Sequence, residues 1–213
     1  MRHRMRPALL FMAALMATPA VLVPATPGHA YAPALTPALV REAQTHYKWI
    51  ASDFLPYPSE WSQALPGNAG FVMVVTPFIR LCMGIAADEY IAHYNHTEAE
   101  HLNPIIVERL NLFFADTLLL YVELPHPSVE PIPARPYVEL VTPAGKTLEP
   151  RSMTVERRPR ELLRGGKDVG YTTRFHVQFA LSDGITPSDT IRVTVRQSGR
   201  VLGTLTFDLR AMR

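Results

Sequence analysis

The stretch HYNHTEAEH, residues 93–101, places three histidines and two glutamates within nine positions. Imidazole and carboxylate groups bind zinc and similar ions, and three or four such ligands are enough for a site. On one continuous helix, His93, His96 and Glu100 share a face because they are three and four residues apart. With His101, which follows directly, they form a candidate metal site whose most suitable ion is zinc.

The same stretch can also be read as the junction between two helices. Thr97 and Glu100 have the T-x-x-E spacing of a capping box, whose two side chains accept hydrogen bonds from backbone N–H groups at a helix start. His93 and His96 then lie at the end of the preceding helix, where a positively charged histidine interacts favourably with the helix dipole. These local roles favour the junction and keep the metal site as the alternative.

Other common catalytic signatures are absent from the sequence, namely H-E-x-x-H, G-x-S-x-G, a Gly-rich phosphate loop and C-x-x-C. Cys82 is the one cysteine, so no internal disulfide can form, and helical spacing places it on an apolar face. We therefore expect a protein that works by binding or by structural interaction, without catalysis and without a cofactor. A metal-binding protein or metal-dependent hydrolase built on residues 93–101 is the alternative.

A second candidate site is the segment 151–167, which holds five arginines and one lysine against two glutamates. Such a segment can contact lipid headgroups, a phosphorylated polymer or an acidic protein, as an envelope-associated factor does. It contains no aromatic residue, which argues against nucleic acid. The alternative, which the composition favours, is a solvated loop between strands. The residues expected to contact an anionic partner are Arg157, Arg158, Arg160 and Arg164.

Residues 1–30 have the pattern of a secretory signal peptide. Three arginines within the first six residues precede an apolar run at 8–23, which is too short and too broken by Pro19 to span a membrane. The small residues around His29 predict cleavage after Ala30, with Ala32 as a second choice and an uncleaved anchor helix as the alternative. We expect a bacterial protein of the periplasm or cell exterior, with no transmembrane span in the mature chain.

Cleavage also changes the charge of the protein. The whole chain carries 21 basic and 19 acidic residues, and residues 1–30 hold three of the basic ones and no acidic one. The mature chain then has one more acidic than basic side chain. It lacks the positive potential that nucleic-acid binding requires, so we expect a protein or cell-envelope partner and no nucleic acid.

Two helices are predicted after the signal peptide. Each begins with a Thr-Pro pair, at Thr36 and at Thr76, because threonine caps a helix start and proline suits the first helical position. Apolar residues follow each pair at three- and four-residue steps, as far as Phe54 and as far as about residue 93. The capping box predicts a third helix from Thr97, and the apolar run 71–75 has the composition of a strand.

From about residue 116 the apolar period changes from that of a helix to that of a strand. Strands are predicted at 117–124 and 137–141, joined by a stiff Pro-rich connection at 125–136. For Val193 to face Leu205 and Ile191 to face Phe207, the last hairpin needs a loop of odd length, which predicts a three-residue loop at 198–200. The clearest alternation of apolar and polar residues lies at 174–181, 191–196 and 204–209.

The predicted fold class is α+β, with N-terminal helices followed by an antiparallel β-sandwich of immunoglobulin-like size. We divide the chain into a signal peptide at 1–30, a helical region at 31–115 that packs on the sandwich, and the sandwich at 116–213. The loops and edge strands of a sandwich are well placed to bind partners, including by addition of a partner's strand.

Overall fold

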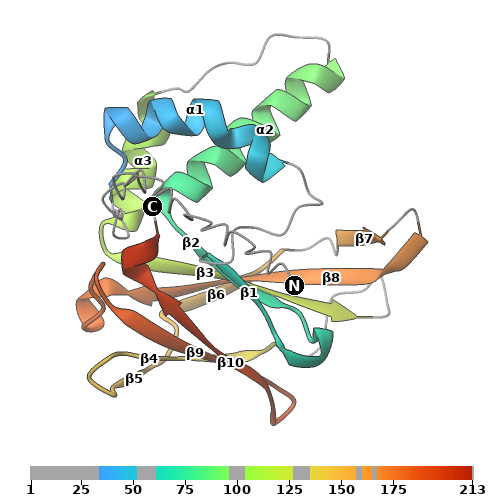
Figure 1. Cartoon of the computed structure of the whole chain (residues 1–213), viewed down its shortest axis with the longest axis vertical. Helices are drawn as coiled ribbons and strands as arrows, with labels where there is room; N and C mark the ends of the chain where they lie inside the picture. Colours follow the sequence, from blue (N-terminus) through green and yellow to red (C-terminus); the bar gives the residue numbers. More distant parts are fainter. Residues whose placement is uncertain are drawn as a thin grey trace, which may run out of the picture.

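The computed structural model describes residues 34–51, 61–95, 104–126, 135–156, 160–164 and 167–212, and the predicted signal peptide lies outside these ranges. Within them the chain forms three α-helices and two antiparallel sheets of six and four strands. The helices lie on one side of the six-stranded sheet and the four-stranded sheet lies on the other (Figure 1). The prediction of an α+β fold rich in antiparallel strands is confirmed.

The helices are α1 (Pro37–Ala51), α2 (Pro77–Asn95) and α3 (Pro104–Phe114). The hydroxyl of Thr36 accepts a hydrogen bond from the Leu39 N–H at 3.3 Å, and the hydroxyl of Thr76 accepts one from the Ile79 N–H at 3.2 Å. Both predicted Thr-Pro helix starts are thereby confirmed. The helix start predicted at Thr97 lies outside the described residues.

The six-stranded sheet is organised around the long pairing of β3 with β8, which runs from Thr117 opposite Ala180 to His126 opposite Tyr171. Two of its strands come from the 31–115 region, so the boundary predicted at residue 116 does not separate the helices from the sheets. The short run 71–75 shows no alternation that would reveal its place beside β3. The strands are β1 (Ser62–Ala64), β2 (Phe71–Val75), β3 (Thr117–His126), β6 (Ser152–Val155), β7 (Arg160–Arg164) and β8 (Lys167–Ala180).

The four-stranded sheet contains the predicted hairpin. Val193 is opposite Leu205 and Ile191 is opposite Phe207, as expected. The three-residue loop is wrong, because Ser198 and Gly199 form a two-residue turn with φ of 49° and 79°. A β-bulge between Val201 and Gly203 supplies the extra residue that restores the register. The strands are β4 (Tyr137–Val141), β5 (Thr147–Leu148), β9 (Thr190–Gln197) and β10 (Arg200–Asp208).

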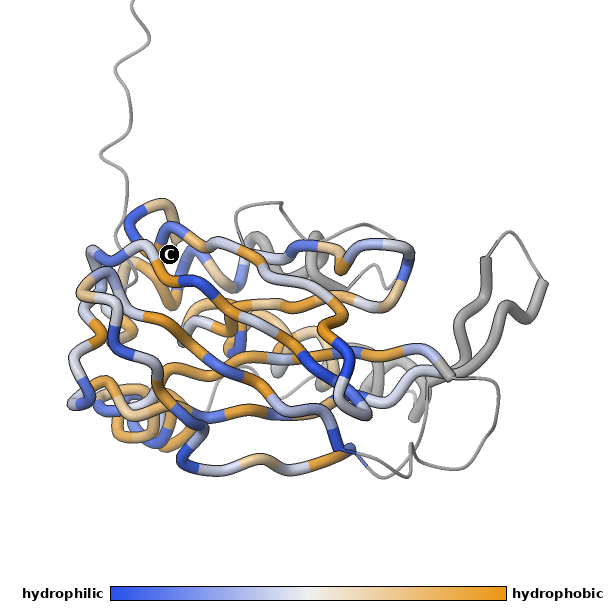
Figure 2. Tube along the Cα trace, turned by 90° about the horizontal axis from the view of Figure 1, so that it is seen from below, coloured by the Kyte–Doolittle hydropathy of each residue, from blue (hydrophilic) through white to orange (hydrophobic). Residues whose placement is uncertain are grey.

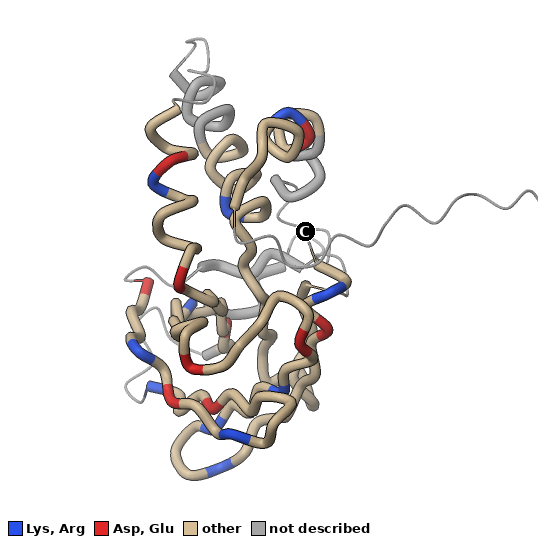
Figure 3. Tube along the Cα trace, turned by 90° about the vertical axis from the view of Figure 1, so that its left-hand side faces the viewer, with Lys and Arg blue, Asp and Glu red and all other residues tan. Residues whose placement is uncertain are grey.

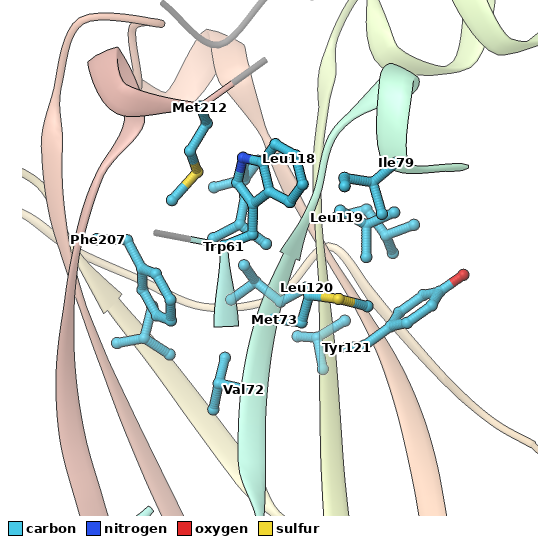
Figure 4. Close-up of a cluster of buried hydrophobic side chains, with 14 of the residues drawn as sticks. Trp61, Val72, Met73, Ile79, Leu118, Leu119, Leu120, Tyr121, Phe207 and Met212 are labelled. Atoms are coloured by element: carbon cyan, nitrogen blue, oxygen red, sulfur yellow. The ribbon is translucent and has the colours of Figure 1, made fainter. Parts of the chain in front are cut away.

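Strand β3 is buried on both faces, from Thr117 to Leu124. Its neighbour α2 places Ile79 beside Leu119, with Tyr121 further along the same strand, while Phe207 lies on the side of β10 (Figure 4). Apolar and polar residues alternate along many of the outer strands (Figure 2). Because helices cover one face of the six-stranded sheet and the second sheet lies on the other, β3 carries a nearly continuous apolar sequence.

The segment 61–70, which holds β1 and a short 3-10 helix (Pro66–Asn68), lies against β10. The Gln63 side-chain amide donates to the Thr206 carbonyl. A Cβ on Gly203 would lie 2.6 Å from Pro66 Cδ, so β10 needs glycine there. This segment covers part of the outer edge of β10 and leaves less of that edge open to a partner strand.

Candidate functional site

A cavity of about 250 Å³ lies between α3 and the six-stranded sheet. Its floor comes from β3 and β8, because the register places Leu119 opposite Gln178 and Tyr121 opposite His176 on one face. Its walls come from the helices, with Arg80 on α2. The lining residues are Arg80, Leu110, Phe113, Phe114, Leu119, Tyr121, His176 and Gln178.

The floor is held by aromatic contacts. The rings of Tyr121 and His176 are stacked, with centroids 4.4 Å apart and planes inclined by 21°. The guanidinium carbon of Arg174 lies 5.1 Å from the centroid of the Tyr121 ring, within the range of a cation–π contact. Tyr121 therefore has two neighbours that limit its rotation, and the floor of the cavity is preorganised.

A buried ion pair lies next to this floor. Glu123 and Arg174 are opposite each other in the β3–β8 register, and the Arg174 Nη2 and Glu123 Oε2 atoms are 2.8 Å apart. The Thr172 hydroxyl donates to Glu123 Oε1 at 3.0 Å, and Glu156 lies 3.9 Å from the guanidinium. These contacts keep the Arg174 guanidinium over the Tyr121 ring. They also pair its positive charge with carboxylates of the protein itself.

Helix α3 is held in place by contacts with neighbouring segments. The Asn111 side chain accepts a hydrogen bond from the Leu35 N–H at 2.6 Å and donates to the Leu35 carbonyl at 3.4 Å, which joins α3 to the start of α1. Phe114 is fully buried and meets Phe113 edge to face, with ring centroids 4.9 Å apart. Beyond the helix, the Asp116 carbonyl accepts from the Leu181 N–H at 2.8 Å. The wall of the cavity is thus held to the start of α1 and, just beyond the helix, to the segment that follows β8.

The mouth of the cavity combines one cation with apolar side chains. Arg80 is exposed, and its guanidinium forms no ion pair with any residue that the structure describes. No acidic residue is among the lining residues. Charged side chains of both signs lie on the described parts of the helices (Figure 3). Exposed apolar side chains continue along α3 from the mouth, namely Ile105, Ile106, Leu112 and Phe113.

The predicted metal ligands mostly fall outside the described ranges. His93 lies in the last turn of α2, but its side chain is not described, and His96, Glu100 and His101 lie outside. Among the described residues, no group of three or more His, Cys, Asp and Glu side chains is placed to hold a metal ion. The zinc site at residues 93–101 stays a prediction, as does the helix junction.

We expect the helix junction to be the correct reading of residues 93–101. A variant with His93→Ala, His96→Ala and His101→Ala should then melt within a few degrees of the parent, because histidines at helix ends contribute little. Melting curves with and without zinc and with and without a chelator test this expectation. Near-stoichiometric zinc in the parent that is lost in the variant would instead establish the metal site.

The predicted anionic-partner segment differs from expectation in its backbone. Residues 151–167 do not form one loop, because β6 and β7 lie within them and both pair with β8. Arg160 and Arg164 belong to β7, and their side chains are not described; Arg157 and Arg158 lie outside the described residues. The strand was not evident because RELLR does not alternate and its pairing depends on the long extension of β8.

Cys82 is buried between α1 and α2, as its spacing predicts. Its side chain is fully buried, and its Sγ donates to the Ala43 carbonyl at 3.9 Å. Burial raises the pKa of the thiol to about 12, and the nearby Glu42 carboxylate adds to this effect. The thiolate, which is the reactive form, is strongly disfavoured, so the expectation of a small buried hydrophobe is confirmed.

We expect Cys82 to react with iodoacetamide about 1,000-fold more slowly in the native protein than in urea at pH 8. The rise in pKa from 9.0 to about 12 lowers the thiolate fraction by about that factor, and burial also restricts the access of the reagent to the thiol. Mass spectrometry of quenched samples measures the rate, and a Cys82→Ala variant gives the background. Native labelling at a rate close to that in urea would show an accessible thiol.

The residues around the cavity were not singled out from the sequence. His176 and Gln178 alternate with the apolar residues of β8. This pattern predicted that their side chains face solvent. The informative signal was the continuous apolar run at 118–122, which is typical of a strand buried on both faces. It indicates that something covers the polar side of β8 as well.

No helix in the described ranges is both long enough and apolar enough to cross a membrane. Comparisons of the chain with models of protein families, with curated proteins and with solved structures found no match. The proposed function therefore rests on the cavity and the residues that line it.

Proposed function

We propose that this chain is a non-catalytic binding protein of the bacterial periplasm or cell exterior, and that the cavity between α3 and the six-stranded sheet is its ligand site. The lining carries this proposal. Five apolar or aromatic side chains surround the space, and Arg80, His176 and Gln178 add polar groups. Ligand sites are typically concave and mostly apolar, with a few placed polar groups that orient the ligand.

The proposal includes a β-sandwich of immunoglobulin-like size as the rigid base of the site. Apolar residues of both sheets belong to one buried cluster, which supports this arrangement. The floor of the cavity lies on the ladder of ten residue pairs between β3 and β8. Side chains on a long central ladder are held more precisely than side chains on loops, which suits a site that must keep its shape.

The chemistry of the lining supports binding over catalysis. Apart from the phenol of Tyr121, which is stacked on His176, it contains no Ser, Thr, Cys, Asp, Glu or Lys side chain that would act as nucleophile or acid. The imidazole is stacked on Tyr121, with the two ring planes 21° apart, which is a packing contact.

The export of the protein rests on residues 1–30, whose charged start, apolar run and small residues at the cleavage position support a signal peptide. A ligand site facing the periplasm or medium would meet small molecules that enter from outside or that the cell releases. The near-neutral charge of the mature chain is compatible with a small ligand.

Filling the cavity tests this proposal. Leu110→Trp places a large ring in the space, while Leu112→Trp, on the exposed side of the same helix, is the matched control. A panel of small aromatic and branched apolar compounds is titrated into the purified protein and followed by backbone-amide NMR. We expect bound compounds to perturb amides around residues 119–121 and 176–178, in the parent and in Leu112→Trp only. Binding that survives Leu110→Trp, or a panel without any binder, would overturn the proposal.

A further inference from the structure

We infer that the ligand of this cavity is a small organic acid, with a carboxylate attached to a compact aromatic or branched apolar body. This ligand class rests on the proposed function and goes beyond it, because it states which groups of the ligand the protein recognises. The charge at the mouth, the polar groups on the floor and the size of the space each contribute.

The charge at the mouth favours an anion. The backbone N–H of Arg80 donates to the Thr76 carbonyl at 2.9 Å, whereas its guanidinium forms no ion pair with a described residue. With no acidic side chain in the lining, this cation is not neutralised within the cavity. A guanidinium presents parallel N–H donors that match the two oxygens of a carboxylate.

The other arginine near the floor is not available to a ligand. Arg174 is buried, lies 2.8 Å from Glu123 and has its guanidinium over the Tyr121 ring. Its positive charge is therefore already paired with a carboxylate of the protein. Arg80 is left as the cation that an incoming acid can reach, which ties the inference to one testable side chain.

The floor offers polar groups that suit the same ligand. His176 and Gln178 are two residues apart on β8, so their side chains share the face that forms the cavity floor. Both are half-buried. The amide of glutamine can donate and accept hydrogen bonds, which allows it to orient a carboxylate or a polar substituent of the ligand.

The size and walls of the cavity define the body of the ligand. A volume of about 250 Å³ lies just below the range of about 300–1,000 Å³ that drug-sized ligands occupy. The edge-to-face pair of Phe113 and Phe114, with Leu110 and Leu119, provides flat and branched apolar surface. This apolar surface suits a single ring or a short branched chain.

Three probes separate the contributions of charge and body. 3-Phenylpropionate carries both, 3-phenylpropionamide has the same body without the charge, and acetate has the charge without the body. The variants are Arg80→Gln and, as the matched control, Arg109→Gln, an exposed arginine on α3 that does not line the cavity. Affinities are measured by NMR titration of the purified protein at constant ionic strength, because exposed charges are screened by salt.

We expect 3-phenylpropionate to bind with a Kd of about 1 mM, as is usual for a ligand of this size. The amide should bind about tenfold more weakly, and acetate should not bind measurably. Arg80→Gln should weaken the acid about tenfold and leave the amide unchanged, while Arg109→Gln should change neither.

The outcomes separate this inference from the proposed function. Equal affinities for acid and amide, unchanged by Arg80→Gln, would overturn the preference for an acid and leave the cavity as a ligand site. Equal losses in Arg80→Gln and Arg109→Gln would show a general field effect and would also overturn it. If neither the acid nor the amide perturbs the floor amides, both the ligand class and the proposed site are wrong.

Discussion

Replacing Arg174 by methionine is expected to lower the free energy of unfolding by about 3–5 kcal/mol. The Arg174 and Glu123 side chains are only 6% and 5% exposed, and their charged atoms are 2.8 Å apart. Methionine fills similar space but leaves the Glu123 carboxylate buried, with the Thr172 hydroxyl as its remaining side-chain donor among the contacts described above. Urea denaturation followed by tryptophan fluorescence measures the loss.

Two control variants make this result specific to a buried charge. Arg174→Met combined with Glu123→Leu removes both partners and should recover most of the lost stability, since apolar replacement of a buried pair is often nearly neutral. Arg210→Met breaks the pair of Arg210 and Asp208, whose side chains are 62% and 42% exposed, and should cost far less than Arg174→Met because solvent screens an exposed pair. A loss in Arg174→Met no larger than in Arg210→Met would contradict the buried pair.

Gly70→Ala is expected to destabilise the protein by about 3 kcal/mol or more. The φ of Gly70 is +131°, which side chains rarely adopt, and a Cβ there would lie 2.1 Å from the Glu123 carbonyl oxygen. That oxygen belongs to the backbone of the central strand β3, so the segment 61–70 must move away. Urea denaturation again measures the effect.

The matched control is Gly145→Ala. Gly145 also has a positive φ, of +80°, but no atom lies within 4 Å of its would-be Cβ. It should cost about 1–2 kcal/mol, which is the penalty for an L-residue in a left-handed conformation alone. Similar losses in the two variants would mean that Gly70 is not in close contact with β3.

Local patterns were enough to predict several elements of this fold. The Thr-Pro pairs predicted the starts of α1 and α2, because a hydroxyl cap and a proline act within one turn. The strand at 137–141 was predicted from a short run ended by a Pro-Ala-Gly turn, and the pairing of Val193 with Leu205 from strict alternation with one buried face. In each case the deciding interactions involve near neighbours in the chain or a clear two-residue period.

The remaining features depend on contacts between distant segments. Strands β2 and β7 are short and do not alternate, so their places beside β3 and β8 are set by the sheet. The bulge at 201–203 changes the parity of a hairpin whose turn alone would place its apolar faces on opposite sides. Register at a bulge cannot be read from alternation on one strand.

The candidate site could not be predicted from the sequence for the same reason. Its lining comes from α2, α3, β3 and β8, and only the fold brings Arg80 near Gln178. The polar residues of β8 were predicted to face solvent, because the sequence of the strand gives no sign of the helices that cover that face. The unbroken apolar sequence of β3 was the one local sign of a covered face.

The most direct test of the ligand site is the position of a bound probe. Intermolecular nuclear Overhauser effects are measured between the ring protons of 3-phenylpropionate and the methyl groups of the protein. The cavity predicts contacts to Leu110 on α3 and Leu119 on β3, which both line the space. Contacts confined to Leu112, which is 69% exposed on the outer side of α3, would place the ligand on the surface and contradict the site.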